Sequence, residues 1–301
     1  MATENYNSPQ AVEAAIKAAA KRANAADPSG AVSDRITQEY FRRFLSRIFS
    51  EEDSSGWVLK GGSGLLARVG SARSTQDVDL YRKNQTLDGA LADIRRLAAI
   101  DLGDFFRFEY TRHGPAIGGQ QTYAEGYHVG FDVYVGANKR GILNVDLVVN
   151  AVMTDNPTVS RPANALILPK LRSHDYRLYP VVDQIADKVC ATFAEYSNRK
   201  STREWDLVDL VVLATTEDVD AEKLSRALAA EARNRGLSLP GRFAVPDGWG
   251  RRYAKDAKPV PACADYQTLD LAVQLMGQFL NPVLAGQATH KTWSHKEKSW
   301  K

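Results

Sequence analysis

Cysteine and long apolar runs are scarce in this chain of 301 residues. The two cysteines, Cys190 and Cys263, lie far apart and in no Cys-x-x-Cys pair. This argues against a disulfide framework and excludes a zinc site built mainly from thiolates. No apolar run approaches membrane-spanning length, and the N-terminus lacks a basic start followed by an apolar stretch. We therefore expect a soluble, cytoplasmic protein with no membrane partner.

A strong excess of one charge is also missing. The chain has 39 basic and 36 acidic residues, a net charge of +3, which by itself does not indicate a nucleic-acid partner. Local basic clusters are more suggestive, because they suit phosphates and, where aromatic residues intervene, stacked bases. A solvated helix face is the alternative for each cluster. The clusters are Arg42, Arg43 and Arg47; Arg199, Lys200 and Arg203; Arg251, Arg252 and Lys255; and a tail, residues 290–301, that interleaves lysines with Trp293 and Trp300.

Apolar residues make up 44% of the chain, enough for a full core. Hydrophobic patterning predicts three parts: N-terminal helices in 1–56, an α+β core in 57–156, and a helical C-terminal domain with a basic tail in 157–301. Within the last part, 157–180 is expected to be a connector and 236–264 a long loop. The expected strands are 57–60, 76–81, 105–111, 127–135 and 141–150, and the expected helices from the core onward are 63–69, 88–100, 181–197, 202–215, 220–235 and 265–280.

Two aspartates one residue apart, Asp77 and Asp79, follow a Gly61-Gly62-Ser63 turn. Strand side chains alternate between faces, so both carboxylates are expected on one face of the sheet. Paired carboxylates repel each other, and a hard cation such as Mg²⁺ removes the conflict while also binding phosphates. The turn offers backbone N–H groups and a hydroxyl to those phosphates. A plain tight turn and exposed turn carboxylates are the alternatives, but the combination favours a metal–triphosphate site.

A third carboxylate is needed to resemble a two-metal site. Asp146 is the only charge in the apolar run 141–149, where an aspartate is costly unless it is paired or metal-bound. The segment 128–135 is expected to be the hairpin partner of this strand, with the turn at 136–141. Asp132 in that segment is a rival ligand. We prefer Asp146 because it lies centrally in the more apolar strand, although a buried structural role for it stays open.

These motifs resemble those of the polymerase-β-like nucleotidyltransferases and, more narrowly, the AbiEii/MenT nucleotidyltransferase toxins of bacterial toxin–antitoxin systems. The narrower resemblance rests on four segments that span 57–210. One departure from the family is Trp205, where many relatives carry a basic residue, so a contact made by that residue is either missing or supplied elsewhere. The four segments are Lys60-Gly61-Gly62-Ser63-x-Leu65, Arg73-x-Thr75-x-Asp77-x-Asp79, Ile185–Ala191 around Lys188, and Arg203-Glu204-Trp205-Asp206-Leu207-Val208-Asp209-Leu210.

The resemblance implies roles in nucleotide binding or catalysis for Lys188, Asp206 and Asp209. Lys188 lies beside the apolar stripe of its expected helix and could offer its ammonium to a triphosphate. The alternative is a surface lysine that pairs with Asp187 or Glu195.

Asp206 and Asp209, three residues apart, can face the same side of a helix. One is expected to orient Lys188 or Arg203 and the other to be a helix-surface charge, and the resemblance implies that Asp209 is the functional one.

Two residues flank the aspartate pair. Thr75 is expected to share a strand face with Asp77, so its hydroxyl can point toward the phosphates. Arg73 either stabilises phosphate charge or pairs with an acidic neighbour, and the sequence does not decide between the two.

The resemblance implies a nucleotidyltransferase toxin that depends on Mg²⁺ or Mn²⁺. It would transfer a nucleoside monophosphate from an NTP to the 3′ end of tRNA, block aminoacylation, and have a cognate antitoxin. Two alternatives remain: the same chemistry on a protein hydroxyl or a small molecule such as an aminoglycoside, and a non-catalytic regulator that binds NTP or RNA. The intact Asp-x-Asp argues against the regulator.

Overall fold

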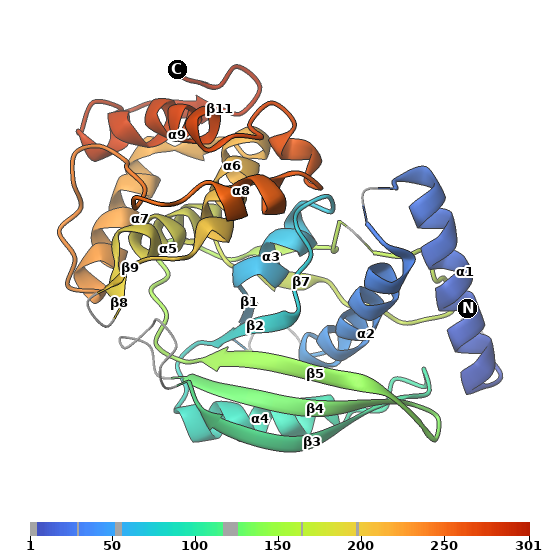
Figure 1. The fold of residues 1–301 in the computed structure, drawn as a ribbon. Coiled ribbons are helices and arrows are strands. Elements are labelled where there is room, and N and C mark those ends of the chain that lie inside the picture. Colours follow the sequence, from blue (N-terminus) through green and yellow to red (C-terminus); the bar gives the residue numbers. More distant parts are fainter. Residues whose placement is uncertain (1–4, 29, 52–55, 117–125, 164, 197–198) are drawn as a thin grey trace. The chain divides into compact units, whose positions relative to one another are not determined.

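The computed structural model describes residues 5–28, 30–51, 56–116, 126–163, 165–196 and 199–301 (Figure 1). The chain forms two compact units. Unit 1 comprises Met1–Gly70, Ser74–Ala151 and Thr158–Leu178, and unit 2 comprises Ser71–Arg73, Val152–Pro157 and Tyr179–Lys301. The chain thus contributes two short segments, 71–73 and 152–157, to unit 2 before the main part of that unit begins.

Unit 1 is built on a mixed sheet in which the described strands have the order β3-β4-β5-β2-β1-β7-β6. Strand β2 runs parallel to β5 and β1 runs parallel to β7, whereas the other neighbours are antiparallel. This confirms the predicted α+β class with a mixed sheet. The strands are β1 (Trp57–Leu59), β2 (Asp77–Arg82), β3 (Phe106–Pro115), β4 (Gly126–Val135), β5 (Asn138–Val148), β6 (Thr158–Ser160) and β7 (Tyr176–Leu178).

Four helices accompany this sheet in the described part of unit 1: α1 (Pro9–Ala26), α2 (Val32–Ile48), α3 (Gly61–Arg68) and α4 (Leu87–Ala98). Helix α4 begins at Thr86, whose hydroxyl accepts the N–H of Gly89, and it buries Leu91, Ile94 and Leu97 against the sheet (Figure 1). Strand β2 buries Val78 and Leu80 in the same core. Because strand side chains alternate, the residues between them are left on the other face.

The first basic cluster of the sequence lies inside unit 1. Arg42, Arg43 and Arg47 on α2 are each at most 6% exposed. Arg42 and Arg43 pair with Glu39 at 2.6 and 2.9 Å, and Arg47 pairs with Asp104 at 2.6 Å. Buried charges need such partners. The interpretation of this cluster as a solvated or RNA-binding face is therefore wrong.

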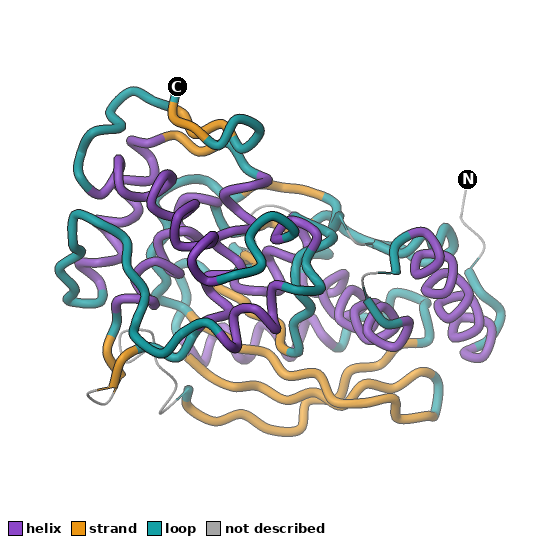
Figure 2. The backbone as a smooth tube through the Cα atoms, turned by 45° about the horizontal axis from the view of Figure 1, so that its top comes forward, coloured by secondary structure: helices purple, strands orange, loops and turns teal. Residues whose placement is uncertain are grey.

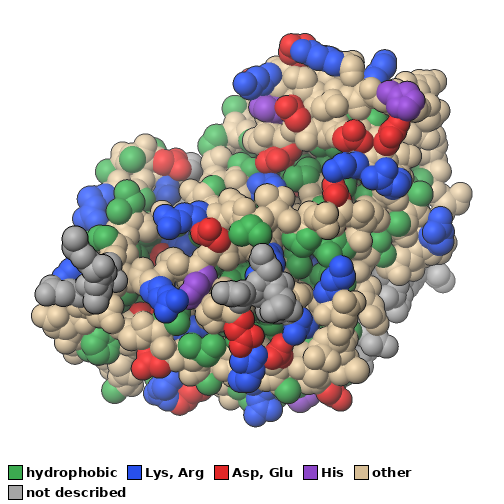
Figure 3. Space-filling model, turned by 180° about the vertical axis from the view of Figure 1, so that it is seen from behind, with side chains coloured by type: hydrophobic (Ala, Val, Ile, Leu, Met, Phe, Trp, Pro, Cys, Tyr) green, Lys and Arg blue, Asp and Glu red, His purple; other side chains and the backbone are tan. Residues whose placement is uncertain are grey.

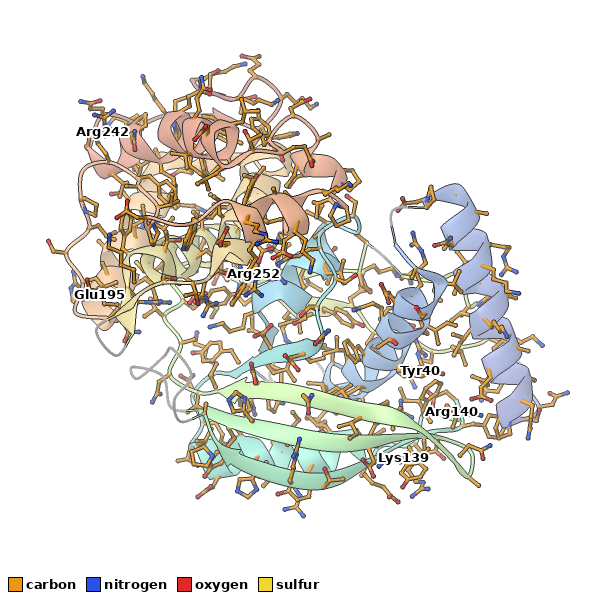
Figure 4. All side chains as sticks on the ribbon, viewed as in Figure 1. Tyr40, Lys139, Arg140, Glu195, Arg242 and Arg252 are labelled. Carbon is orange, nitrogen blue, oxygen red and sulfur yellow. The ribbon has the colours of Figure 1, made fainter. Side chains whose placement is uncertain are left out.

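Helix α1 is fastened to the far end of the β4–β5 hairpin. Arg140, labelled with Lys139 in Figure 4, donates to Glu13 of α1 at 2.7 Å. Val12, Ile16 and Ala19 of the same helix belong to the core cluster of the sheet. The N-terminal helices thus share one hydrophobic core with the strands.

Unit 2 is mainly helical, with α6 at its centre. Helix α6 is buried along its length from Asp206 to Ala214 and packs against α5, α8 and α9. A helix that is apolar on all sides requires such surroundings. The helices are α5 (Val181–Phe193), α6 (Glu204–Thr216), α7 (Ala221–Asn234), α8 (Arg251–Ala257), the 3₁₀ turn η2 (Pro261–Cys263) and α9 (Leu269–Leu284); the strands are β8 (Glu195–Tyr196), β9 (Arg199–Lys200), β10 (Val219–Asp220), β11 (Thr292–Ser294) and β12 (Ser299–Trp300).

The C-terminal tail is part of this unit and not a free basic arm. Its strands β11 and β12 pair with each other and with β10, as the small strands near the C-terminus in Figure 2 show. Trp293 is fully buried and donates to the carbonyl of Ala214 at 2.8 Å. Trp300 stacks on Phe279, with ring centroids 5.9 Å apart. The prediction that these tryptophans serve stacked bases is wrong, because they form the apolar face of a small sheet.

Two further expectations missed short elements. The connector 157–180 contains β6 and β7, which extend the sheet of unit 1, and the loop 236–264 contains α8 and η2.

Among the described residues, no helix is long and apolar enough to cross a membrane. On the face drawn in Figure 3, basic and acidic side chains are interspersed and do not gather by sign.

Candidate functional site

The sheet of unit 1 carries a row of polar residues on the face opposite its core. In the pairing of β2 with β5, Asp79 lies opposite Asp146 and Asp77 lies opposite Asn144. In the pairing of β5 with β4, Asp146 lies opposite His128. Directly opposite residues on neighbouring strands point to the same face. Three strands therefore bring Asp79, Asp146 and His128 into one row across the sheet.

The Gly-Gly-Ser turn begins helix α3 and lies against Asp79. Gly61 has a φ of +58°, and a Cβ at this position would overlap with the Asp79 carboxylate. The Ser63 hydroxyl accepts the backbone N–H of Asp79 at 3.0 Å and donates to the carbonyl of Lys60 at 3.1 Å. Only glycine allows both this backbone conformation and so close an approach. The turn predicted to hold phosphates is thus packed directly on the second aspartate of Asp-x-Asp.

The register separates the two rivals for the third carboxylate. Asp146 is adjacent to Asp79 and accepts a hydrogen bond from Nδ1 of His128 at 2.5 Å. Asp132 lies opposite Ile142 and forms an ion pair with Lys139 at 2.6 Å. The sheet therefore places Asp146, and not Asp132, beside the Asp-x-Asp pair. The Asp146 side chain is 41% exposed, so it is not the buried structural aspartate of the alternative interpretation.

Asp77 has an electrostatic environment that favours a bound cation. Burial and the negative charge of Asp146 raise the pKa of the Asp77 carboxyl, although a hydrogen bond from Asn144 opposes the shift. The hydroxyl of Thr75 donates to the backbone carbonyl of Asp77 at 3.2 Å. Thr75 precedes β2, so the expectation that it shares a strand face with Asp77 is wrong: the turn before the strand occupies its hydroxyl donor.

The donor chemistry of this row fits a hard divalent cation, since it offers carboxylate oxygens whose mutual repulsion a cation would relieve. The side chains as they stand do not converge on one point. In the part of the chain that the structure describes, no group of three or more His, Cys, Asp or Glu side chains could hold a metal ion. The row thus fits a metal by the chemistry of its donors, although the described side chains do not form a complete metal site as they stand.

Unit 2 contains the second set of predicted residues, in a buried charge cluster. Lys188 donates to Asp206 at 3.0 Å and to Asp209 at 2.5 Å. Arg73 donates two hydrogen bonds to the carboxylate of Asp209, at 2.8 and 2.9 Å, and Arg203 donates to Asp206 at 2.6 Å. The two aspartates and the lysine are at most 3% exposed. The structure thus brings together Arg73, Lys188, Arg203, Asp206 and Asp209.

This cluster decides several open points. Neither aspartate is a helix-surface charge, and each contacts two cations. Lys188 is not a surface lysine, and Asp187 pairs with Arg235 instead. Burial alone would lower the pKa of Lys188, but the attraction of Asp206 and Asp209 outweighs burial and raises it. Burial likewise would raise the pKa of Asp209, whereas Lys188 and Arg73 lower it. The charged forms of Lys188 and Asp209 are therefore favoured by each other.

The two predicted RNA-binding clusters are partly neutralised within unit 2. Lys200 pairs with Asp247 at 2.7 Å, and Arg203 belongs to the buried cluster. Arg251 and Lys255 form no ion pair within the described residues, and both are exposed. Arg199 lies on β9, and its side chain is outside the described set. Within these two clusters, the charges that are unpaired among the described residues are those of Arg251 and Lys255 on α8, whereas Arg252 pairs with Asp256 at 3.5 Å.

Trp205, the departure from the family motif, is surrounded by arginines. The guanidinium of Arg252 lies 4.3 Å from the centroid of its ring, and that of Arg203 lies 5.7 Å from it. Figure 4 shows Arg252 on α8. Both distances are within the range of cation–π attraction. Two basic groups, from Arg203 and from α8, thus lie beside Trp205.

Sequence reasoning missed His128 and Asn144. The predicted turn at 136–141 would pair Val135 with Ile142 and hence Asp146 with Phe131. The observed turn is tighter, with Val135 opposite Asn138, and a bulge follows at Val133 and Tyr134. The shorter turn slides β5 along β4 and brings Asp146 opposite His128. A two-residue Gly136-Ala137 turn was the signal that could have shown this pairing.

The comparison with family models agrees with the motifs of the sequence. The family model described as nucleotidyl transferase AbiEii toxin, type IV toxin–antitoxin system, matches residues 43–275. Two similar crystal structures come from Helicobacter pylori. One is JHP933, with 16% identity and a TM-score of 0.42, covering 83% of this chain and 93% of its own. The other is a candidate nucleotidyltransferase, with 15% identity and a TM-score of 0.40, covering 83% and 95%. Among curated proteins, none matches the chain significantly.

The protein is thus a nucleotidyltransferase by class, and the chain belongs to the AbiEii toxin family of type IV toxin–antitoxin systems. The resemblance to AbiEii toxins seen in the sequence is confirmed. Membership of this family implies an NTP substrate and an antitoxin partner, and nucleotidyltransferases generally use a divalent metal.

Proposed function

We propose that the protein transfers a nucleoside monophosphate from an NTP to the 3′ end of tRNA, with Mg²⁺ as the metal, and thereby blocks aminoacylation. The observation that carries the proposal is the placement of Asp79 beside Asp146 on parallel strands, with the start of α3 packed on Asp79. Adjacent carboxylates together with a helix start that can bind phosphate suit a metal–triphosphate complex.

In this proposal Asp77, Asp79 and Asp146 hold the cation. When bound, Mg²⁺ would neutralise phosphate charge and make the attacking hydroxyl more acidic. The backbone of Gly61 and Gly62 and the hydroxyl of Ser63 support the phosphates at the start of α3. The Ser63 hydroxyl donates to the carbonyl of Lys60 and accepts the N–H of Asp79, so it would have to release Lys60 in order to donate to a phosphate.

The bond changes balance without any further reactant. The hydroxyl oxygen of the acceptor bonds to the α-phosphorus, the bond from that phosphorus to the bridging oxygen of the β-phosphate breaks, and pyrophosphate leaves. Asp146 is proposed to receive the hydroxyl proton, since it lies beside Asp79 and its side chain is 41% exposed.

The buried cluster of unit 2 is proposed to support nucleotide binding through Arg73. The ammonium of Lys188 is engaged by two carboxylates, so we assign it to holding Asp206 and Asp209 in place. Asp209 in turn fixes the Arg73 guanidinium, whose side chain is 22% exposed. Arginine suits phosphate through its planar array of donors. Thr75, two residues after Arg73, is proposed to assist by holding the turn before β2, since its hydroxyl donates to the backbone carbonyl of Asp77.

The acceptor tRNA is proposed to contact Arg251, Arg252 and Lys255 of α8, together with Arg199, Lys200 and Arg203. The support for this is the exposure of Arg251 and Lys255, which form no ion pair within the described residues, and the cation–π contact of Arg252 with Trp205. Guanidinium and aromatic groups suit the phosphates and bases of an unpaired RNA end.

The decisive experiment is incubation of the purified protein with each labelled NTP, Mg²⁺ and total tRNA, followed by gel electrophoresis. We expect label in the tRNA band with at least one NTP, and none with Asp79→Asn. Expression in a bacterium is expected to arrest growth, and Asp79→Asn is expected to relieve the arrest.

Label that appears in protein or in a small molecule, and never in RNA, would move the acceptor to one of those classes. Tight NTP binding with no release of pyrophosphate would instead favour a non-catalytic regulator.

A further inference from the structure

We propose that His128 is a positioning residue for the third carboxylate of the site. Its Nδ1 holds one oxygen of Asp146, Oδ1, and thereby fixes the rotation of the carboxylate that leaves Oδ2 for the cation or for the attacking hydroxyl. The inference rests on the proposed function, since it takes Asp146 to be the carboxylate that acts there.

The pairing of the strands determines the geometry. His128 on β4 and Asp79 on β2 flank Asp146 on β5, each directly opposite it. The distance from Nδ1 to Oδ1 is 2.5 Å. An ionised carboxylate can only accept, so the Nδ1 of His128 must carry the proton and donate. Donation to Asp146 therefore requires a proton on Nδ1, whether the ring is neutral or charged.

The pair has little to contribute to stability. The side chains of His128 and Asp146 are 57% and 41% exposed. Ion pairs between side chains this exposed typically contribute little to stability. An orienting role is more consistent with the location of the pair, because carboxylates that act on metals or protons are commonly held by a second hydrogen-bonding group.

The other histidines lie away from this row. His113 bonds the hydroxyl of Tyr110, and His174 bonds the carbonyl of Ser46. His290 and His295 pair with Glu222 and Asp218 in unit 2. His128 is the one histidine whose bond goes to a carboxylate beside the Asp-x-Asp pair. His113, which is also exposed and lies on the neighbouring strand β3, provides a matched control.

The test compares four variants of the full chain: His128→Ala, His128→Asn, His128→Gln and the control His113→Ala. The amide nitrogen of asparagine occupies nearly the position of Nδ1, whereas that of glutamine corresponds to the more distant ring nitrogen. Two readouts are needed. One is the kinetics of nucleotide transfer, resolved into kcat and KM for NTP. The other is Mn²⁺ affinity, measured by electron paramagnetic resonance without NTP.

Loss of an orienting partner typically costs about 10–100-fold in activity or metal affinity. We expect His128→Ala to lower kcat by about that factor with KM for NTP nearly unchanged, and to weaken Mn²⁺ binding. His128→Asn should recover most of both, and His128→Gln much less. His113→Ala should match the wild type in both readouts.

Each outcome has a meaning. Wild-type kcat and Mn²⁺ affinity in His128→Ala overturn the inference and leave the proposed function standing. If the wild type transfers no nucleotide to any acceptor but His128→Ala still weakens Mn²⁺ binding and His128→Asn restores it, the inference holds and the proposed function fails. If transfer occurs without measurable Mn²⁺ binding, the kcat pattern decides. A wild type that neither binds Mn²⁺ nor transfers nucleotide overturns both.

Discussion

Individual charges on one face of the unit 1 sheet are expected to control transfer while contributing little to folding. Asp77 and Asp79 alternate with buried Val78 and Leu80, so the carboxylates themselves are not part of the core. The raised pKa of Asp77, caused by burial and by Asp146, shows that its charge is held against a cost. Polar substitutions on this face can therefore separate catalysis from stability.

Asp77→Asn and Asp79→Asn should each reduce nucleotide transfer by at least about 100-fold, because each removes a carboxylate from the proposed metal site. Without metal, Asp77→Asn should melt no lower than the wild type, since it removes a charge that repels Asp146. Transfer assays and thermal melts would measure both effects, and removal of divalent metal by chelation should reproduce the loss.

The control for these variants is Asp132→Asn, which changes an aspartate of the same sheet that pairs with Lys139. It should keep near wild-type activity. Near wild-type transfer by purified Asp79→Asn would show that the metal-site assignment is incorrect.

The buried cluster of unit 2 should respond unequally to the loss of its members. Three cations and two carboxylates give it a net charge of +1. Lys188→Met leaves two neutral pairs, Arg73–Asp209 and Arg203–Asp206. Asp209→Asn leaves three cations with one carboxylate, a net charge of +2. Asp209→Asn should cost about 3–5 kcal/mol of unfolding free energy, and Lys188→Met less than about half of that.

Chemical denaturation of the purified variants would test this order. An equal or larger loss in Lys188→Met would mean that the ammonium matters for more than the balance of charge. If Lys188→Met keeps NTP affinity, the lysine is not itself a phosphate ligand.

The stability that the Asp209 carboxylate contributes should depend on pH. The pKa of Asp209 is lowered below 3.8 in the folded protein, because Lys188 and Arg73 outweigh the effect of burial. Its contribution to stability is therefore complete above the unfolded value of 3.8 and is lost as pH falls through the folded value. The stability difference between the wild type and Asp209→Asn should be constant near neutral pH and shrink below about pH 4. A difference that stays constant in acid would contradict this.

At the residue scale, sequence reasoning found the aspartates and Lys188 and anticipated that an aspartate contacts Lys188 or Arg203, but it did not identify Asp209 as the partner of Arg73. Motif spacing shows which residues share a helix or strand face. It does not show that Asp209 bonds Arg73, which is 136 positions away. The burial of Lys188 was hidden for the same reason, since a lysine beside an apolar stripe looks like a surface residue until its counter-charges are placed.

Among the elements, the sequence predicted long, periodic ones well and short or aperiodic ones poorly. Helix α5 was expected within a few residues of its observed bounds, because its apolar residues recur at helical spacing, and helix α6 was expected nearly as closely although it is apolar on all sides. Strands β6 and β7 have three residues each, too few for a visible alternation. Helix α8 follows a Gly- and Pro-containing stretch and is held by Glu204, which accepts the N–H of Gly250 and Tyr253. That tertiary contact has no local signal.

The joint between β1 and α3 should depend on one glycine. Gly61→Ala would place a methyl group against the Asp79 carboxylate at a positive φ, so either the turn or the aspartate must move. We expect transfer to fall by at least about tenfold and unfolding free energy to drop by about 1–3 kcal/mol. The control is Gly141→Ala on β5, where a Cβ meets nothing within 4 Å. Wild-type activity and stability in Gly61→Ala would show that the close approach is not required.

At the scale of the whole molecule, the order of motifs predicted the fold class, and composition predicted an ordered core. The division of the chain was harder to foresee. Residues 71–73 and 152–157 join unit 2 although unit 1 surrounds them in sequence. The helices before residue 57 share their core with the sheet. The hydrophobic pattern along the sequence cannot show which unit such a segment joins, because this depends on which distant segments pack together. The cohesion of the C-terminal tail, with Trp293 in its core, was missed for the same reason.

Binding of RNA and binding of NTP should separate by salt and by mutation. Neutralising phosphates with basic side chains releases counterions, so RNA affinity should fall steeply as salt rises, whereas NTP affinity should fall less. Arg251→Glu with Arg252→Glu should weaken RNA binding and reduce the salt slope by about 1–2, since each phosphate contact on a single strand contributes about 0.7. NTP affinity should stay unchanged, because neither arginine belongs to the Asp-x-Asp row or to the buried cluster.

The matched control is Arg226→Glu with Arg233→Glu, an equal change of charge at two exposed positions of α7. Fluorescence anisotropy with labelled tRNA over a range of salt would measure both double variants. If the two weaken RNA binding equally, the effect is one of net charge, and α8 is not the docking surface.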